Sequence, residues 1–164
     1  MRYEQATGNE RFSTLPQFSL DVGRITGPKY KALLHSYSYW SGDLLDSLQH
    51  PDKQEYITTV KFPLRAIGIR DYVSGMDRWN TITHAAQKEG IALCPQLTAA
   101  EMARLNANII GEGEYVDVLS EPILDRSGDQ GVFELGRNGG ELRLGRGWMG
   151  HGWSPDSLVV GRLR

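Results

Sequence analysis

The segment from Gly147 to Asp156 contains the residue types that could do chemistry in this chain. Trp148 and Trp153 flank His151 among glycines. Glycines let a ligand approach the backbone closely, and tryptophans offer flat surfaces for a base, a sugar or a side chain. His151 titrates near neutral pH and could act as an acid or a base. The segment is therefore a candidate binding loop, and the alternative is an ordinary loop whose tryptophans cap the core.

The first functional hypothesis is a small soluble accessory protein that acts as a binding or interaction module. The partner is expected to be another protein, which the Gly/Trp/His-rich segment would contact. No recognisable catalytic set accompanies this segment, which favours binding over catalysis. The expected binding residues are Trp148, His151, Trp153, Arg143 and Arg146.

Two alternatives stay open, and with them the question of whether the chain is an enzyme. A small hydrolase or transferase would use His151 as acid or base, with Asp156 or Glu121 to orient it. A nucleic-acid-binding protein would use the tryptophans together with C-terminal arginines, provided that the arginines share one face of a sheet. Those arginines are Arg137, Arg143, Arg146, Arg162 and Arg164.

The sequence predicts neither a metal site nor a cofactor. The stretch Asp125–Asp129 resembles a calcium loop, but Gln130 stands at the glycine position and Gly136 at the position of the final glutamate. A polar hairpin turn is the expected structure there. The single cysteine, Cys94, excludes an internal disulfide. We expect Cys94 to be buried, and the alternative is a reactive pair with His84.

One pattern in the second half of the chain consists of Gly90–Pro95, Leu119–Ile123, Asp125, Gly128 and Phe133. This pattern resembles a group of small bacterial hypothetical proteins. In that group a helix leads into a Gly-hydrophobic-x-Leu-Cys-Pro segment, and a second helix, a strand ending near Glu-Pro-Ile and a β-hairpin follow. The resemblance covers about residue 56 to the C-terminus and implies a fold without implying a catalytic role.

Length and composition are those of an ordinary globular protein. The chain has 164 residues, of which 40% are hydrophobic and 23% charged, with a net charge of −2. This charge does not favour a general phosphate-binding surface. The sequence contains no apolar run of the roughly 20 residues that span a bilayer. We therefore expect no membrane partner and a cytoplasmic location.

The elements that would position these residues begin with helices. Residues 1–23 are expected to form an irregular arm with a short strand around 18–22, and residues 24–164 a single domain. Helix starts are expected at Thr26, at Ser41, at Asp77 or Asn80, and at Thr98, where Thr98 and Glu101 fit a capping box. One early strand is expected at about 56–62, where β-branched residues are dense.

From Tyr115 onward the apolar residues alternate, which predicts strands. Strands are expected at 115–119, 132–135, 142–144 and 158–163, with Asn138-Gly139-Gly140 as a tight hairpin turn. The predicted fold class is α+β, with N-terminal short helices packed on a C-terminal antiparallel β-meander. The final strand could leave a sheet edge open, which would allow a homodimer.

Overall fold

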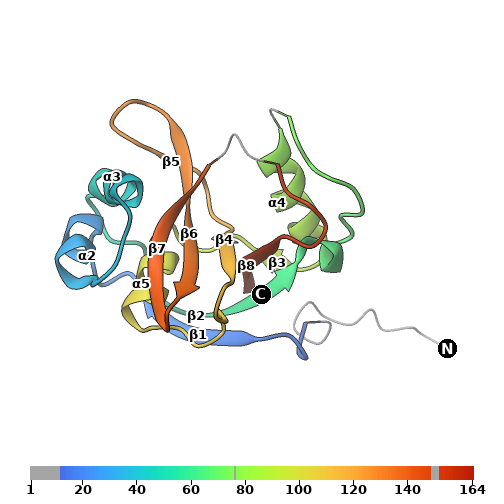
Figure 1. The fold of residues 1–164 in the computed structure, drawn as a ribbon, viewed down its shortest axis with the longest axis horizontal. Coiled ribbons are helices and arrows are strands. Elements are labelled where there is room, and N and C mark those ends of the chain that lie inside the picture. The colour runs from blue at the N-terminus through green and yellow to red at the C-terminus, as the bar shows by residue number, and fades with distance from the viewer. Residues whose placement is uncertain (1–11, 76, 149–151) are drawn as a thin grey trace.

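A computed structural model describes residues 12–75, 77–148 and 152–164. This part of the chain forms four α-helices, one short 3₁₀ helix and a single eight-stranded sheet (Figure 1). The strands are β1 (Gln17–Val22), β2 (Glu55–Pro63), β3 (Ile91–Ala92), β4 (Tyr115–Val118), β5 (Ile123–Leu124), β6 (Gln130–Asn138), β7 (Glu141–Trp148) and β8 (Leu158–Leu163). The helices are α2 (Gly27–Leu33), α3 (Tyr39–Ser47), η1 (Leu64–Ile67), α4 (Arg78–Lys88) and α5 (Thr98–Arg104).

The fold is of mixed α and β type, as predicted, but the expected order of helices first and meander last is wrong. Strands β1 and β2 come early in the chain and pair antiparallel with each other. The last strand, β8, lies between β2 and β4 rather than at an edge. It runs antiparallel to β2 and parallel to β4, so the sheet is mixed. The short strand expected around residues 18–22 is present as β1.

The two faces of the sheet carry separate hydrophobic cores. The α5 face, which α2, α3 and α5 cover, buries alternate residues such as Ile57, Phe133 and Leu144. The other face, here called the α4 face, buries Phe62 and Val159 with side chains of α4 and η1. Figure 1 shows α2 and α3 beside β7 at one end of the sheet and α4 at the other. Alternation along each strand produces this division, because successive side chains point to opposite faces.

Of the expected helix caps one is present, those at Ser41 and Thr98 are wrong, and Asp77 precedes α4 without a side-chain capping hydrogen bond. Thr26 caps α2 as predicted, since its side chain accepts the N–H of Lys29. Ser38 rather than Ser41 caps α3. Helix α5 begins at Thr98 but without a capping box, because no side chain caps it and Glu101 is recruited elsewhere. The buried Glu101 carboxylate accepts hydrogen bonds from the Tyr30 hydroxyl and the Arg104 guanidinium.

The β6–β7 hairpin has the predicted two-residue turn. Gly139 and Gly140 adopt φ values of +64° and +81°, which only glycine tolerates readily. The Glu112 carboxylate accepts the N–H groups of both glycines. Arg137 donates to backbone carbonyls of residues 107 and 110, at 2.8 and 2.6 Å. These contacts fix the hairpin against the loop that precedes β4.

None of the helices in the described residues has both the length and the apolar character required to span a bilayer.

Candidate functional site

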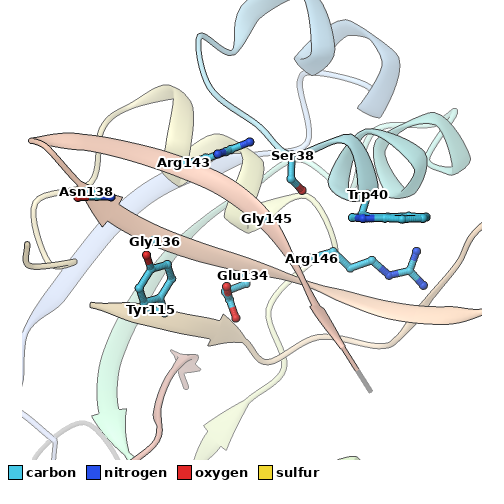
Figure 2. Close-up of a pocket in the computed structure, with 9 residues that line it drawn as sticks. All are labelled: Ser38, Trp40, Tyr115, Glu134, Gly136, Asn138, Arg143, Gly145 and Arg146. Atoms are coloured by element: carbon cyan, nitrogen blue, oxygen red, sulfur yellow. The ribbon is translucent and has the colours of Figure 1, made fainter. Parts of the chain in front are cut away.

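The α4 face is hollowed where it crosses strands β4, β6 and β7. Two adjoining hollows of about 330 and 420 Å³ share Tyr115, Glu134 and Arg146 among their lining residues. Figure 2 shows the first hollow with its nine lining residues. The second hollow continues toward Gly152 and Trp153. We call the two together the sheet groove.

Strand register arranges the floor of the sheet groove in rows. In one row Arg143 of β7 lies opposite Gly136 of β6, which lies opposite Tyr115 of β4. The next row has Gly145 opposite Glu134, which lies opposite Asp117. Directly opposed residues point to the same face of a sheet. Each row therefore contains a glycine directly beside a longer side chain.

The glycines make room for the side chains beside them. A methyl group at Gly136 would lie 2.6 Å from ring atoms of Tyr115, so the phenol ring lies directly over this glycine. At Gly147 a methyl group would overlap the Asp117 carboxylate. At Gly145, by contrast, the nearest atoms would be 3.8 Å away, on Glu134. The floor above Glu134 is consequently open.

Asp117 is held in place at one wall of the groove. The indole N–H of Trp153 donates to Oδ2 of Asp117 at 2.7 Å. Trp153 is itself buried, and its ring lies 5.5 Å from that of Trp79, centroid to centroid. Asp117 is therefore fixed in position directly opposite Glu134.

Glu134 is the titratable group in the middle of the sheet groove. Burial, together with the neighbouring charge of Asp117, raises the pKa of Glu134 to about 7. A carboxyl group with this pKa is partly protonated at neutral pH and can donate or accept a proton. Its carboxyl group lies directly opposite that of Asp117 across β4 and β6.

The segment between α2 and α3 closes the outer edge of β7 and brings an aromatic residue to the groove. Ser36 and Ser38 pair with the backbone of Leu144, with the Ser38 N–H donating to the Leu144 carbonyl at 2.9 Å. Trp40 follows at the start of α3 and lines the first hollow (Figure 2). Its side chain and that of Tyr115 are about half exposed or more, so two aromatic rings border the groove.

The predicted Gly/Trp/His segment contributes one wall of the sheet groove. Gly147, Gly152 and Trp153 line the second hollow. Trp148 is the last residue of β7, where it pairs with Gly131. His151 lies outside the described residues. The proposed acid–base role of His151 therefore stays a prediction.

The two carboxylates proposed to orient His151 do not line the sheet groove. Asp156 is exposed and forms an ion pair with Arg65 at the start of the 3₁₀ helix. Glu121 is exposed after β4, where its backbone carbonyl accepts the side-chain amide of Gln96 at 3.2 Å.

The C-terminal arginines do not share one face of the sheet. Arg143 lies opposite Gly136 and Arg146 opposite Phe133, so these two point to opposite faces. Arg146 is buried and forms an ion pair with Asp125 at 2.9 Å. This hydrogen-bonded pair lowers the pKa of Asp125. Arg137 is bonded to the backbone beside the hairpin, and Arg162 pairs with Glu55 at 2.8 Å. A nucleic-acid surface was expected only if these arginines shared one face of the sheet, and they do not.

Cys94 and the Asp125–Asp129 stretch, the remaining candidates for chemistry, have structural environments. Cys94 is buried, and burial raises the pKa of its thiol to about 12. The stretch Asp125–Asp129 is a turn between β5 and β6, in which Oδ1 of Asp125 accepts the N–H groups of Ser127 and Asp129. Within the described ranges, no three carboxylate, histidine or cysteine side chains gather as a metal site would require.

Sequence reasoning missed Tyr115, Asp117 and Glu134 as site residues. A signal was present in the strand alternation, because Glu134 is a charged residue between two apolar ones, Phe133 and Leu135. The tight turn at residues 138–140 also implies that Glu134 lies opposite Gly145. The position of Asp117 opposite Glu134 depends on the pairing of β4 with β6, which no local signal specifies.

Comparisons of this chain with protein families, with curated proteins and with solved structures give no match.

Proposed function

We propose that this protein is a binding module that docks an extended segment of a partner protein in the sheet groove. The observation that carries the proposal is the glycine floor of the groove between exposed aromatic rings. Glycines such as Gly145 allow a bound chain to approach the backbone of the sheet. The hollows, at about 330 and 420 Å³, match the lower range of ligand pockets.

The rings that border the groove are suited to anchor a protein segment. Tyr115 is 60% exposed and Trp40 is 50% exposed. Large aromatic side chains bury much apolar area on binding and lose little conformational freedom, which makes them common anchors at interfaces. Residues 36–38 pair with Leu144 in the middle of the outer edge of β7, so a bound segment would lie over the floor rather than extend the sheet along this edge.

The charges that line the groove are mixed, with Arg143 and Arg146 beside the two carboxylates, which gives a nucleic acid few cationic contacts. Asp117 and Glu134 face each other on the floor, and carboxylates repel phosphate groups. Tight nucleic-acid binding requires several cationic contacts to phosphates. We therefore keep the hypothesis of an interaction module and propose that its binding surface is the sheet groove, of which the Gly/Trp/His segment forms only one wall.

A groove-filling substitution tests this proposal. Gly145→Leu should place an apolar side chain in the groove above Glu134, because a Cβ atom at this position lies 3.8 Å from its nearest neighbours. A phage-displayed library of random peptides is selected on the wild-type protein. We expect the enriched peptides to bind Gly145→Leu at least tenfold more weakly.

Ser19→Leu provides the matched control, because Ser19 is exposed on β1, at the far edge of the same sheet. This variant should bind the selected peptides like the wild type. Equal binding by Gly145→Leu, or a selection that enriches no peptide above an empty support, would contradict the proposal. Circular dichroism and thermal unfolding establish that both variants are folded.

A further inference from the structure

We infer that Asn138, at the tip of the β6–β7 hairpin, is a site of spontaneous deamidation, and that the Glu112 carboxylate restrains this reaction in the native protein. The inference concerns a modification of the chain itself and does not depend on the docking function. Its basis is the Asn138-Gly139 sequence in an exposed turn and the two hydrogen bonds that Glu112 accepts there.

An asparagine followed by glycine can react with its own backbone. The Gly139 nitrogen, after losing its proton to solvent, attacks the side-chain carbonyl carbon Cγ of Asn138. A bond forms between this nitrogen and Cγ, the bond between Cγ and Nδ2 breaks, and the side-chain nitrogen takes a proton from solvent and leaves as ammonia. Water then opens the five-membered succinimide ring at either carbonyl. Position 138 becomes an aspartate or an isoaspartate.

The turn has the features that favour this reaction. Gly139 has no side chain that would hinder the approach of its nitrogen to Cγ. Asn138, Gly139 and Gly140 are all exposed, so water reaches the reacting atoms. Figure 2 shows Asn138 at the end of β6, away from Trp40. Asparagine is among the residues that heat damages chemically, and this asparagine stands in the sequence most prone to it.

Glu112 holds the nitrogen that would attack. Its Oε1 accepts the N–H of Gly139, and its Oε2 accepts the N–H of Gly140 at 3.0 Å. The attack requires the Gly139 amide as an anion, and a negative charge beside a group disfavours its anionic form. A carboxylate is also far too weak a base to remove an amide proton itself. The contact therefore slows the reaction rather than assists it.

The hairpin geometry adds a second restraint. Asn138 is the last residue of β6 and pairs with Glu141 of β7. In an extended residue the following nitrogen is turned away from the side chain, so ring closure requires the backbone of Asn138 to rotate about its Cα–C bond. That rotation would move the N–H groups of both glycines away from Glu112. The folded hairpin thus has to open before Asn138 can react.

Deamidation would in turn weaken the hairpin. An aspartate at position 138 lies directly opposite Glu141, and directly opposed like charges destabilise a sheet. An isoaspartate lengthens the main chain inside the turn, and a two-residue turn sets the register of the strands beside it. The modification would therefore loosen the contact between the hairpin tip and the loop that precedes β4.

Peptide mass spectrometry tests the inference. Wild type and Glu112→Gln, which keeps the shape of the side chain and removes its charge, are incubated at pH 8, each in buffer and in urea. Cleavage after glutamate releases residues 135–141, and chromatography separates the asparagine, aspartate and isoaspartate forms of this peptide. Glu121→Gln removes an equal charge at an exposed position after β4 and is the matched control. Circular dichroism and thermal unfolding establish that the variants are folded in buffer.

We expect Asn138 of native Glu112→Gln to deamidate about tenfold faster than that of native wild type, since a hydrogen bond to a charged group contributes about this factor. Glu121→Gln should react like the wild type. In urea all three chains should react at one rate, faster than the native wild type. Equal rates for native wild type and native Glu112→Gln would overturn the inference. So would a native wild type that reacts as fast as its unfolded chain, or an Asn138 that stays intact in urea, and neither of these two results depends on a variant.

Discussion

Replacing Glu134 by glutamine should stabilise the protein at pH 8 and leave its stability nearly unchanged at pH 4. Burial and the charge of Asp117 raise the pKa of Glu134 from its ordinary value of 4.5 to about 7. The folded chain therefore binds more protons than the unfolded chain between these two values. The contribution of Glu134 to stability is fully present below pH 4.5 and is lost as the pH rises through 7. Glutamine has nearly the shape of the protonated side chain and carries no charge to lose.

The size of the effect follows from the difference between the two pKa values. One pH unit corresponds to about 1.4 kcal/mol, so the full difference corresponds to about 3 kcal/mol. Glu134 is only partly buried, and solvent screening reduces this figure. We therefore expect Glu134→Gln to raise the free energy of unfolding at pH 8 by about 1 to 3 kcal/mol.

Urea unfolding followed by tryptophan fluorescence measures this difference directly. Wild type and Glu134→Gln are compared from pH 4 to pH 8, and only the difference between them is interpreted, because other groups titrate equally in both. Glu141→Gln is the control for the loss of one negative charge. A difference that stays below about 0.5 kcal/mol at pH 8, or that does not grow between pH 5 and pH 7, would refute the electrostatic account of the groove.

Three further outcomes are expected from the packing around the groove. Gly147→Ala should lower the free energy of unfolding, because its methyl group overlaps the Asp117 carboxylate. Gly145→Ala should leave the free energy of unfolding unchanged or raise it by up to about 1 kcal/mol. Urea titrations measure both differences. Arg146→Ala should lower the urea midpoint clearly, whereas Arg143→Ala at an exposed position should change stability by less than about 0.5 kcal/mol. Cys94 should react with a thiol reagent such as Ellman's reagent only after unfolding, and fast reaction of the native protein would contradict its burial.

The sequence alone was enough to place most of the local elements. Strand β8 has the expected bounds, and β2, β6 and β7 are longer than the predicted strands. The Asn138-Gly139-Gly140 turn fixes the hairpin register, because a two-residue loop leaves only one pairing of its flanking residues. The capping box at Thr98 failed because the buried contacts of Glu101 with Tyr30 and Arg104 replace the local one.

What the sequence determined by itself is therefore the location of the six longer strands and the pairing of β6 with β7, whereas the two-residue strands β3 and β5 were not predicted. The pairing places Glu134 opposite Gly145 and on the same face as Gly136, since successive residues of a strand point to opposite faces. Only the tertiary structure decided that β8 lies between β2 and β4 and that Asp117 faces Glu134. The physical reason is that the register between strands distant in sequence is set by burial of a whole face, to which every element contributes.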